Sequence, residues 1–252
     1  MGTRKALIAG NWKMYTTVVD GCRLALDVAK TCSDFGDREV LLAPPYTILS
    51  EVAHVLAGTS IILASQNVCW AEKGAFTGEI SPVMIKDAGC RAAIVGHSER
   101  RQIFGETDEL INKRVKGAVQ FGLLTILCIG ETLSERESGR TFEVLADQVR
   151  KGLASLTATD MANVVVAYEP VWAIGTGKTA SKEQAQEAHA FIRGVLAQIF
   201  EKTVAEQTRI LYGGSVKPTN IDELMAQADI DGALVGGAAL DAESFGRIIH
   251  FQ

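Results

Sequence analysis

Residues 210–239 read ILYGGSVKPTNIDELMAQADIDGALVGGAA, a segment in which two short apolar runs each end in a pair of glycines. The glycine pairs begin at Gly213 and Gly236. A glycine pair lets the backbone approach an anion closely, because no Cβ stands in the way. One such pair alone would indicate a tight turn. Two pairs at the ends of successive candidate strands favour a phosphate site built from both loops.

Six further apolar runs of strand length precede this segment. The full set of candidate strands is 6–10, 40–43, 61–64, 92–95, 125–129, 164–168, 210–212 and 233–235. Most of these runs are continuously apolar rather than alternating, as expected for parallel strands that are covered on both faces. The sequence therefore predicts eight buried parallel strands.

The intervals between the runs are long enough for the crossover that parallel neighbours require. Segments 141–156 and 181–200 show apolar residues at helical spacing. Ser81, which precedes a proline, and Ser181 and Thr219, which precede acidic residues, are predicted helix N-caps. Strand and helix therefore alternate along the chain.

Eight strand-helix units in 252 residues match the usual size of one barrel. No Pro/Ser-rich linker or change of composition divides the chain, so we expect one α/β domain over residues 1–252. The predicted architecture is a (β/α)8 TIM barrel, with eight parallel strands and surrounding helices. An open doubly wound sheet would show the same alternation, and only the motifs can distinguish the two.

The composition excludes several classes of function. A net charge of -5 with dispersed basic residues argues against nucleic acid, and no apolar stretch is long enough to span a membrane. The five cysteines form an odd set without a CxxC pair, which indicates neither a disulfide framework nor a zinc site. A core of this size needs no metal or cofactor for stability, so we expect none and predict a cytoplasmic protein.

Polar residues at strand ends are the first candidates for chemistry, because active sites of such folds lie at the carboxyl ends of the strands. Asn11 and Lys13 follow the first run, His97 the fourth and Glu169 the sixth. Lys13 could be a surface charge and His97 a structural imidazole, but their positions favour an anion contact and a catalytic role. Glu169, among apolar neighbours, is a candidate general base, with a structural ion pair as the alternative.

The segment 173–180, AIGTGKTA, invites two misreadings. A Walker A loop would require glycine where Trp172 stands, and a dinucleotide fingerprint would follow its strand directly, whereas Gly175 lies seven residues beyond Tyr168. A mobile lid is the better interpretation, with Pro170 stiffening one end and residues 178–180 permitting rotation at the other. Such a lid could close over a phosphate.

Together the motifs resemble the triosephosphate isomerase family over almost the whole chain. The matching segments are AGNWKM at 9, QN at 66, GAFTGEIS at 74, GHSERR at 96, CIGE at 128, YEPVWAIGTGKTA at 168, YGGSV at 212 and VGGA at 235. No single element would suffice, but their order and spacing are specific. The resemblance implies a cofactor-free interconversion of glyceraldehyde 3-phosphate and dihydroxyacetone phosphate, in glycolysis and gluconeogenesis.

The resemblance also implies roles for individual residues. The family is a standard example of an enzyme that pairs a glutamate base with a neutral histidine. Glu169 would remove a proton beside the substrate carbonyl, His97 would polarise that carbonyl, and Lys13 with Asn11 would stabilise the anionic intermediate. Glu99 is expected to support Lys13. The phosphate would meet backbone N–H groups of four residues, Gly175, Ser215, Gly236 and Gly237.

In the family, the loop corresponding to Gln66 to Glu79 reaches into a second subunit, so the resemblance implies a homodimer. An ordinary surface loop is the alternative. Trp70 and Phe76 favour an interface, because they would otherwise be exposed. The sequence departs from the family at Tyr15 and Cys69, and both departures are expected to touch the interface.

Two further functions remain open from the residues alone. One is a different phosphate-binding barrel enzyme that acts on a larger sugar phosphate in a roomier pocket. The other is a dimeric scaffold without turnover, which predicts the loss of catalytic side chains. The candidate catalytic residues Asn11, Lys13, His97 and Glu169 are all present.

Overall fold

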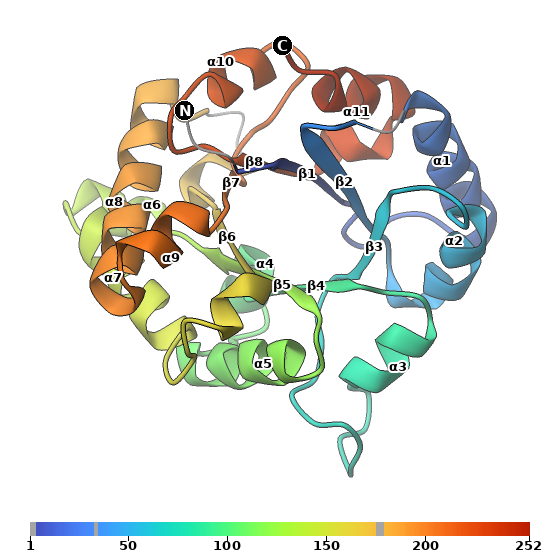
Figure 1. Cartoon of the computed structure of the whole chain (residues 1–252), viewed down its shortest axis with the longest axis horizontal. Coiled ribbons are helices and arrows are strands. Elements are labelled where there is room, and N and C mark those ends of the chain that lie inside the picture. The colour runs from blue at the N-terminus through green and yellow to red at the C-terminus, as the bar shows by residue number, and fades with distance from the viewer. Residues whose placement is uncertain (1–3, 33–34, 175–178) are drawn as a thin grey trace.

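A computed structural model describes residues 4–32, 35–174 and 179–252 of the chain. In this part, eight strands pair in chain order, every pair is parallel, and β8 returns to β1 to close a barrel (Figure 1). The predicted (β/α)8 architecture is confirmed and the open sheet is excluded. The strands are β1 Ala6–Asn11, β2 Arg38–Ala43, β3 Ile62–Ser65, β4 Ala92–Val95, β5 Leu124–Ile129, β6 Val164–Tyr168, β7 Ile210–Tyr212 and β8 Gly232–Val235.

The α-helices form a ring around the strands in Figure 1. They are α1 Val18–Thr31, α2 Leu49–Val55, α3 Pro82–Asp87, α4 Ser98–Gln102, α5 Asp108–Gln120, α6 Leu133–Glu137, α7 Thr141–Gly152, α8 Lys182–Phe200, α9 Lys202–Gln207, α10 Ile221–Met225 and α11 Ala242–Ile249. Short 3-10 turns are η1 Tyr46–Ile48, η2 Asp160–Asn163, η3 Val171–Ala173 and η4 Gly237–Leu240. The helix expected over 141–156 therefore ends earlier, at Gly152.

Two of the three predicted N-caps are confirmed. The side chain of Ser81 accepts a hydrogen bond from the N–H of Met84, and Ser181 forms a reciprocal capping box with Gln184. The prediction of Thr219 as an N-cap is wrong, because Asn220 occupies the N-cap of α10. The Asn220 Oδ1 instead accepts a hydrogen bond from the N–H of Lys217, which closes the preceding turn.

Each strand buries both of its faces, which explains the continuous apolar runs. In β1, Leu7 and Ala9 point into the barrel, whereas Ile8 packs between the sheet and the helices. The interior cluster comprises Leu7, Ala9, Leu41, Ala43, Ala64, Ala92, Ile94, Ile126, Cys128, Val165, Ala167, Leu211 and Leu234. The barrel is therefore a packed core, and any cavity must lie at its ends.

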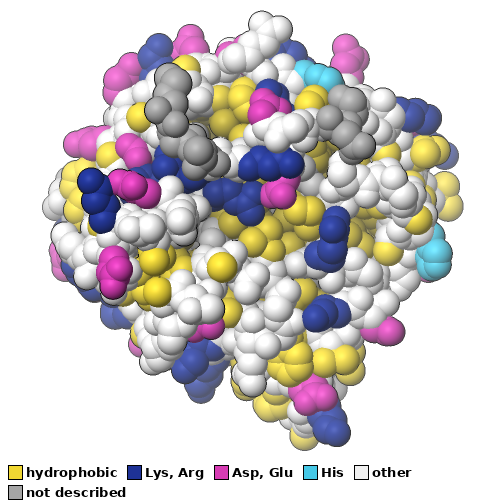
Figure 2. All heavy atoms as spheres, in the orientation of Figure 1, with side chains coloured by type: hydrophobic (Ala, Val, Ile, Leu, Met, Phe, Trp, Pro, Cys, Tyr) yellow, Lys and Arg dark blue, Asp and Glu magenta, His cyan; other side chains and the backbone are white. Residues whose placement is uncertain are grey.

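The connection between β3 and α3 projects beyond the ring of helices (Figure 1). Hydrophobic side chains gather on this projection (Figure 2). Trp70 and Phe76 pack edge to face within it, with ring centroids 5.2 Å apart, yet Phe76 remains 39% exposed. Of the two aromatic residues, Phe76 is therefore exposed in the single chain, whereas Trp70 is half-buried.

A buried ionic cluster ties α8 to the connection between β7 and β8. The guanidinium of Arg193 donates to carboxylate oxygens of Asp229 at 2.6 Å and Asp231 at 2.7 Å. It also donates to the carbonyls of Ala205 and Thr208. Because these residues precede β8, the cluster lies at the end of the barrel opposite the carboxyl ends of the strands.

We predict that Arg193→Met lowers the free energy of unfolding by about 3–5 kcal/mol, because half-buried Asp229 loses its ion pair and buried Asp231 keeps only Arg4 as an ionic partner among the described residues. Urea denaturation at fixed protein concentration measures the change. Arg150→Met is the matched control, since Arg150 is exposed and donates only to Gln198 among the described residues, and we expect a change of about 0.5 kcal/mol or less. An equal loss in both variants would contradict the role of the cluster.

Candidate active site

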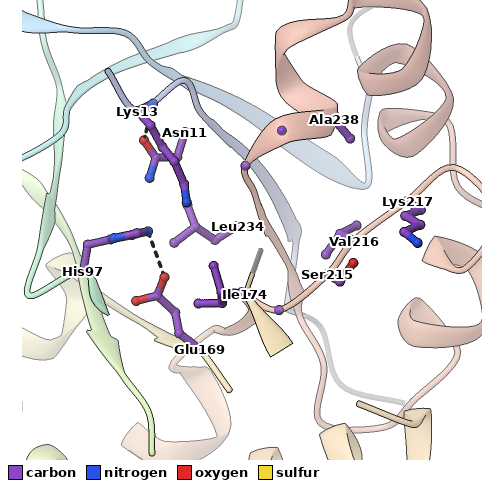
Figure 3. A pocket seen from close by; sticks show the side chains of 14 residues that line it. Asn11, Lys13, His97, Glu169, Ile174, Ser215, Val216, Lys217, Leu234 and Ala238 are labelled. Atoms are coloured by element: carbon purple, nitrogen blue, oxygen red, sulfur yellow. Dashed lines mark hydrogen bonds and ion pairs between the residues drawn. The ribbon is translucent and has the colours of Figure 1, made fainter. Parts of the chain in front are cut away.

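A cavity of about 290 Å³ opens at the carboxyl ends of the strands. It brings together side chains from β1, β4 and β6 and the two glycine-pair loops (Figure 3). The predicted site residues that line it are Asn11, Lys13, His97, Glu169, Ser215, Gly236 and Gly237. Gly175 lies outside the described residues, as do residues 176–178 of the expected lid. Residues that are far apart in sequence thus meet in one pocket.

Lys13 has an unusual backbone conformation for a residue with a side chain, with a φ of 51°. Its N–H donates to Asn11 Oδ1 at 3.0 Å, and its carbonyl accepts from the side chain of Gln66 at 2.7 Å. These two bonds hold the turn. Its ammonium then lies 2.6 Å from Glu99 Oε1, as the expected support by Glu99 requires.

His97 follows β4 and occupies the N-cap of α4, with 6% of its surface exposed. Its Nδ1 accepts a hydrogen bond from the N–H of Glu99 at 3.2 Å. Because a nitrogen that accepts this bond carries no proton, the ring proton belongs on Nε2. Nε2 points to Glu169 Oε1, 2.9 Å away (Figure 3). The neutral ring is therefore oriented to donate into the cavity.

Glu169 is 2% exposed, and its carboxylate is held from two sides. Oε1 faces His97, and Oε2 accepts from the backbone N–H of Ser98 at 2.9 Å. Its backbone has equally close neighbours. A Cβ at Gly130 would lie 1.7 Å from the Glu169 carbonyl oxygen, and one at Gly213 would lie 2.8 Å from its Cγ. Glycines on both sides thus make room for this residue.

The two buried groups shift each other's pKa. Burial opposes the charge on Glu169, but His97, the Ser98 N–H and Lys13 outweigh burial and lower its pKa. Burial likewise opposes protonation of His97, but the carboxylates of Glu169 and Glu99 raise its pKa. Both directions depend on the contact between the two side chains. If Glu169 moves away from His97, neither group offsets the effect of burial on the other. Burial then lowers the pKa of His97 and raises the pKa of Glu169.

The other end of the cavity is formed by backbone. Ser215 follows the first glycine pair, and Gly236 and Gly237 begin the 3-10 turn η4. A Cβ at Gly237 would meet open space, whereas one at Gly236 would lie 3.3 Å from the Cε of Lys13. The loops after β7 and β8 therefore present main chain to the cavity close to Lys13.

The sequence reasoning assigned no role to Ser98 or Glu131, although both stand in quoted motifs. Glu131 is fully buried and accepts hydrogen bonds from the hydroxyl of Tyr168, at 3.1 Å, and from the indole of Trp172, at 2.9 Å. It also pairs with Arg136 at 3.1 Å. The sequence signal for Glu131 is a carboxylate two residues after β5, similar to the strand-end signal that indicates Glu169. Glu131 anchors the segment that follows Glu169.

Other features bear on the expected ligands and partners. Within residues 4–32, 35–174 and 179–252, no three His, Cys, Asp or Glu side chains are grouped as a metal ion would require. No helix in these ranges combines the length and apolar character needed to cross a membrane. Cys69, expected at an interface, is 2% exposed because its side chain packs inside the chain, whereas Tyr15 is 58% exposed.

Comparison with known proteins agrees with the geometry. The family model described as "Triosephosphate isomerase" matches residues 6–252. A protein named triosephosphate isomerase from Citrifermentans bemidjiense is 56% identical over 249 residues, covering 99% of each chain. Similar proteins of the same name come from Trichlorobacter lovleyi, at 54% identity over 99% of each chain, and from Thermoanaerobacter sp., at 50% over 98% of this chain and 100% of the relative.

We predict that Glu169→Gln lowers the pKa of His97 below its ordinary value, because removal of the Glu169 charge leaves burial with little opposition. Protonation of His97 is then lost at a lower pH than in the unaltered protein. Titration followed by ¹⁵N NMR of the ring nitrogens measures this shift. His54, which is exposed and distant in sequence, serves as an internal reference. An unchanged or raised midpoint for His97 would refute the coupling.

Proposed function

The chain belongs to the triosephosphate isomerase family, and we propose that Glu169, His97, Lys13 and Asn11 carry out that family's reaction in the 290 Å³ cavity. The reaction interconverts glyceraldehyde 3-phosphate and dihydroxyacetone phosphate. The observation that carries the assignment is the direct contact of a buried carboxylate with an oriented neutral imidazole, beside a lysine.

In the proposed mechanism, Glu169 removes a proton from the carbon beside the substrate carbonyl. The electrons of that C–H bond form the C=C bond of an enediolate, and the carbonyl oxygen gains the negative charge. The Nε2–H of His97 donates to this oxygen and transfers protons between the two substrate oxygens. Glu169 then returns its proton to the neighbouring carbon, so no oxidant, metal or cofactor is consumed.

Both catalytic groups must exchange partners when substrate enters. The Nε2–H of His97 would donate to the substrate carbonyl in place of Glu169, and Glu169 would leave the N–H of Ser98. Away from these donors, burial raises the pKa of Glu169 toward neutrality, as a general base requires. Lys13 and Asn11 would stabilise the developing negative charge.

The phosphate would bind at the opposite end of the cavity, on backbone N–H groups of Ser215, Gly236, Gly237 and Gly175. The loop that contains Gly175 would close over it. Closure would exclude water and prevent the enediolate from losing phosphate. The small cavity supports a three-carbon substrate over the larger sugar phosphates that other barrels accept, although Gly175 itself lies outside the described residues.

We predict that Glu169→Asp lowers kcat by about 100- to 10,000-fold, because the shorter side chain withdraws the base from the carbon-bound proton. The rate of conversion of glyceraldehyde 3-phosphate without added metal or cofactor measures the effect. Binding of inorganic phosphate should persist in the variant. An unchanged rate would remove Glu169 from the mechanism, and a folded but inactive wild-type protein would favour the scaffold function.

We also propose a homodimer formed through the loop from Gln66 to Glu79. Support comes from Phe76 on the β3–α3 projection, which is 39% exposed, and from Met14, which is 93% exposed. Met14 follows Lys13, whose carbonyl accepts a hydrogen bond from the side chain of Gln66. Isolated exposure is common, but a projecting loop that presents apolar residues favours a protein contact. We further infer a cytoplasmic location, because all five cysteines are free thiols.

Met14→Glu should shift the protein from dimer to monomer, since a buried unpaired charge at an interface costs several kcal/mol. Analytical ultracentrifugation at micromolar concentration measures the change. Leu26→Glu on α1 is the control, because Leu26 is also exposed but is not part of the proposed surface. A monomeric wild type, or an unaltered dimer in Met14→Glu, would refute this surface.

A further inference from the structure

The cavity has three charged lining residues among those described, Lys13, Glu169 and Lys217. Lys13 is already paired with Glu99 at 2.6 Å, and Glu169 carries a negative charge next to a neutral imidazole. The two carboxylates of Glu169 and Glu99 therefore balance the two positive charges of Lys13 and Lys217. Without Lys217, these groups would give the pocket a net charge of -1, which repels a phosphate dianion.

Lys217 differs from Lys13 because no ion pair joins it to any residue in the described part of the chain. Its side chain is exposed at the rim of the cavity, beyond Ser215 and Val216 and away from His97 (Figure 3). Its charge is therefore directed to solvent rather than to a protein partner.

The position of Lys217 is fixed by its turn. Its backbone N–H donates to Asn220 Oδ1 at 2.8 Å, and the Asn220 Nδ2 donates to the carbonyl of Ser215 at 3.0 Å. One asparagine thus ties Lys217 to the loop that forms the phosphate end of the cavity. The ammonium of Lys217 remains free to move, but the backbone of Lys217 is held in place.

We propose that Lys217 is a steering residue that accelerates capture of the phosphate dianion without taking part in proton transfer. The proposal rests on the assignment of the Ser215 and Gly236 loops to the phosphate. The whole chain carries a net charge of -5, so an approaching dianion meets overall repulsion. A free cation at the mouth of the pocket reverses the local field where the phosphate must enter.

Capture matters for this reaction. The family is a standard example of enzymes whose kcat/KM approaches the diffusional ceiling, so the encounter step limits turnover at low substrate concentration. Steering acts over the Debye length, about 30 Å at 10 mM ionic strength and about 8 Å at 150 mM. The contribution of Lys217 should therefore appear at low salt and fade at high salt.

The test compares Lys217→Met, Lys217→Glu and Lys217→Arg with wild type, measuring kcat/KM for glyceraldehyde 3-phosphate at ionic strengths of about 10 and 300 mM. We expect kcat/KM to fall about 3-fold for Met and about 10-fold for Glu at low salt, and less than about 1.5-fold for Met at high salt. The arginine variant should match wild type, because only the charge is required.

Lys116→Met is the matched control, since it removes the same charge from an exposed lysine on α5, outside this cavity. D-glyceraldehyde, which has no phosphate, provides a second control, and its slow conversion should be equal in all proteins. A loss that persists at high salt, appears with D-glyceraldehyde, or is equal in Lys116→Met would overturn the proposal, as would an unchanged Lys217→Met. An inactive wild type would instead count against the proposed function.

Discussion

The arrangement of the active site depends on the close approach of backbone around Glu169. The carbonyl of this residue lies so near Gly130 that a Cβ there would be 1.7 Å away, and Gly213 leaves similar room beside its side chain. Its N–H donates to the carbonyl of Ile129 at 2.7 Å. Three consecutive strand ends, from β5 to β7, thus fix the position of the proposed general base. Cavity shape, imidazole orientation and the mutual pKa shifts all follow from that position.

The barrel separates its stabilising charges from its reactive ones. The Arg193 cluster lies before β8, where Asp229 and Asp231 accept hydrogen bonds from the guanidinium. The cavity lies at the opposite end, at the carboxyl ends of the strands. At the stabilising end, every strong charge of the cluster has a partner. At the cavity end, Lys217 has no ion pair among the described residues, and Glu169 makes contacts with His97 and Ser98 that the proposed mechanism replaces. The ionic contacts at the Arg193 end are therefore static, whereas we expect those at the cavity end to change when a ligand binds.

Most of the fold could be predicted from the sequence, because local rules decide it. Continuous apolar runs gave the strands to within one or two residues, and Ser81 and Ser181 marked helix starts by capping chemistry alone. Thr219 failed because its neighbour Asn220 can satisfy a turn as well as a helix, and local sequence does not rank those two uses. The burial of Cys69 could not be predicted, because the burial of a loop residue depends on tertiary packing.

The candidate site was predicted in its residues but not in its contacts. Strand-end position and family resemblance together identified His97 and Glu169, yet neither could reveal that the Ser98 N–H holds the carboxylate. Glu131 was passed over because its partners Tyr168 and Trp172 become neighbours only when β5 and β6 pair. Contacts that cross between strands need the closed barrel, and a sequence pattern does not contain them.

The backbone conformation of Lys13 lowers the stability of the fold at a residue that we propose to be catalytic. At a φ of 51°, a lysine is strained by about 1 kcal/mol that a glycine would not carry. Selection for resistance to heat alone would therefore favour glycine at the position whose ammonium we propose to act on the substrate. Engineering for thermal stability by replacing residues with strained backbones should therefore leave Lys13 unchanged.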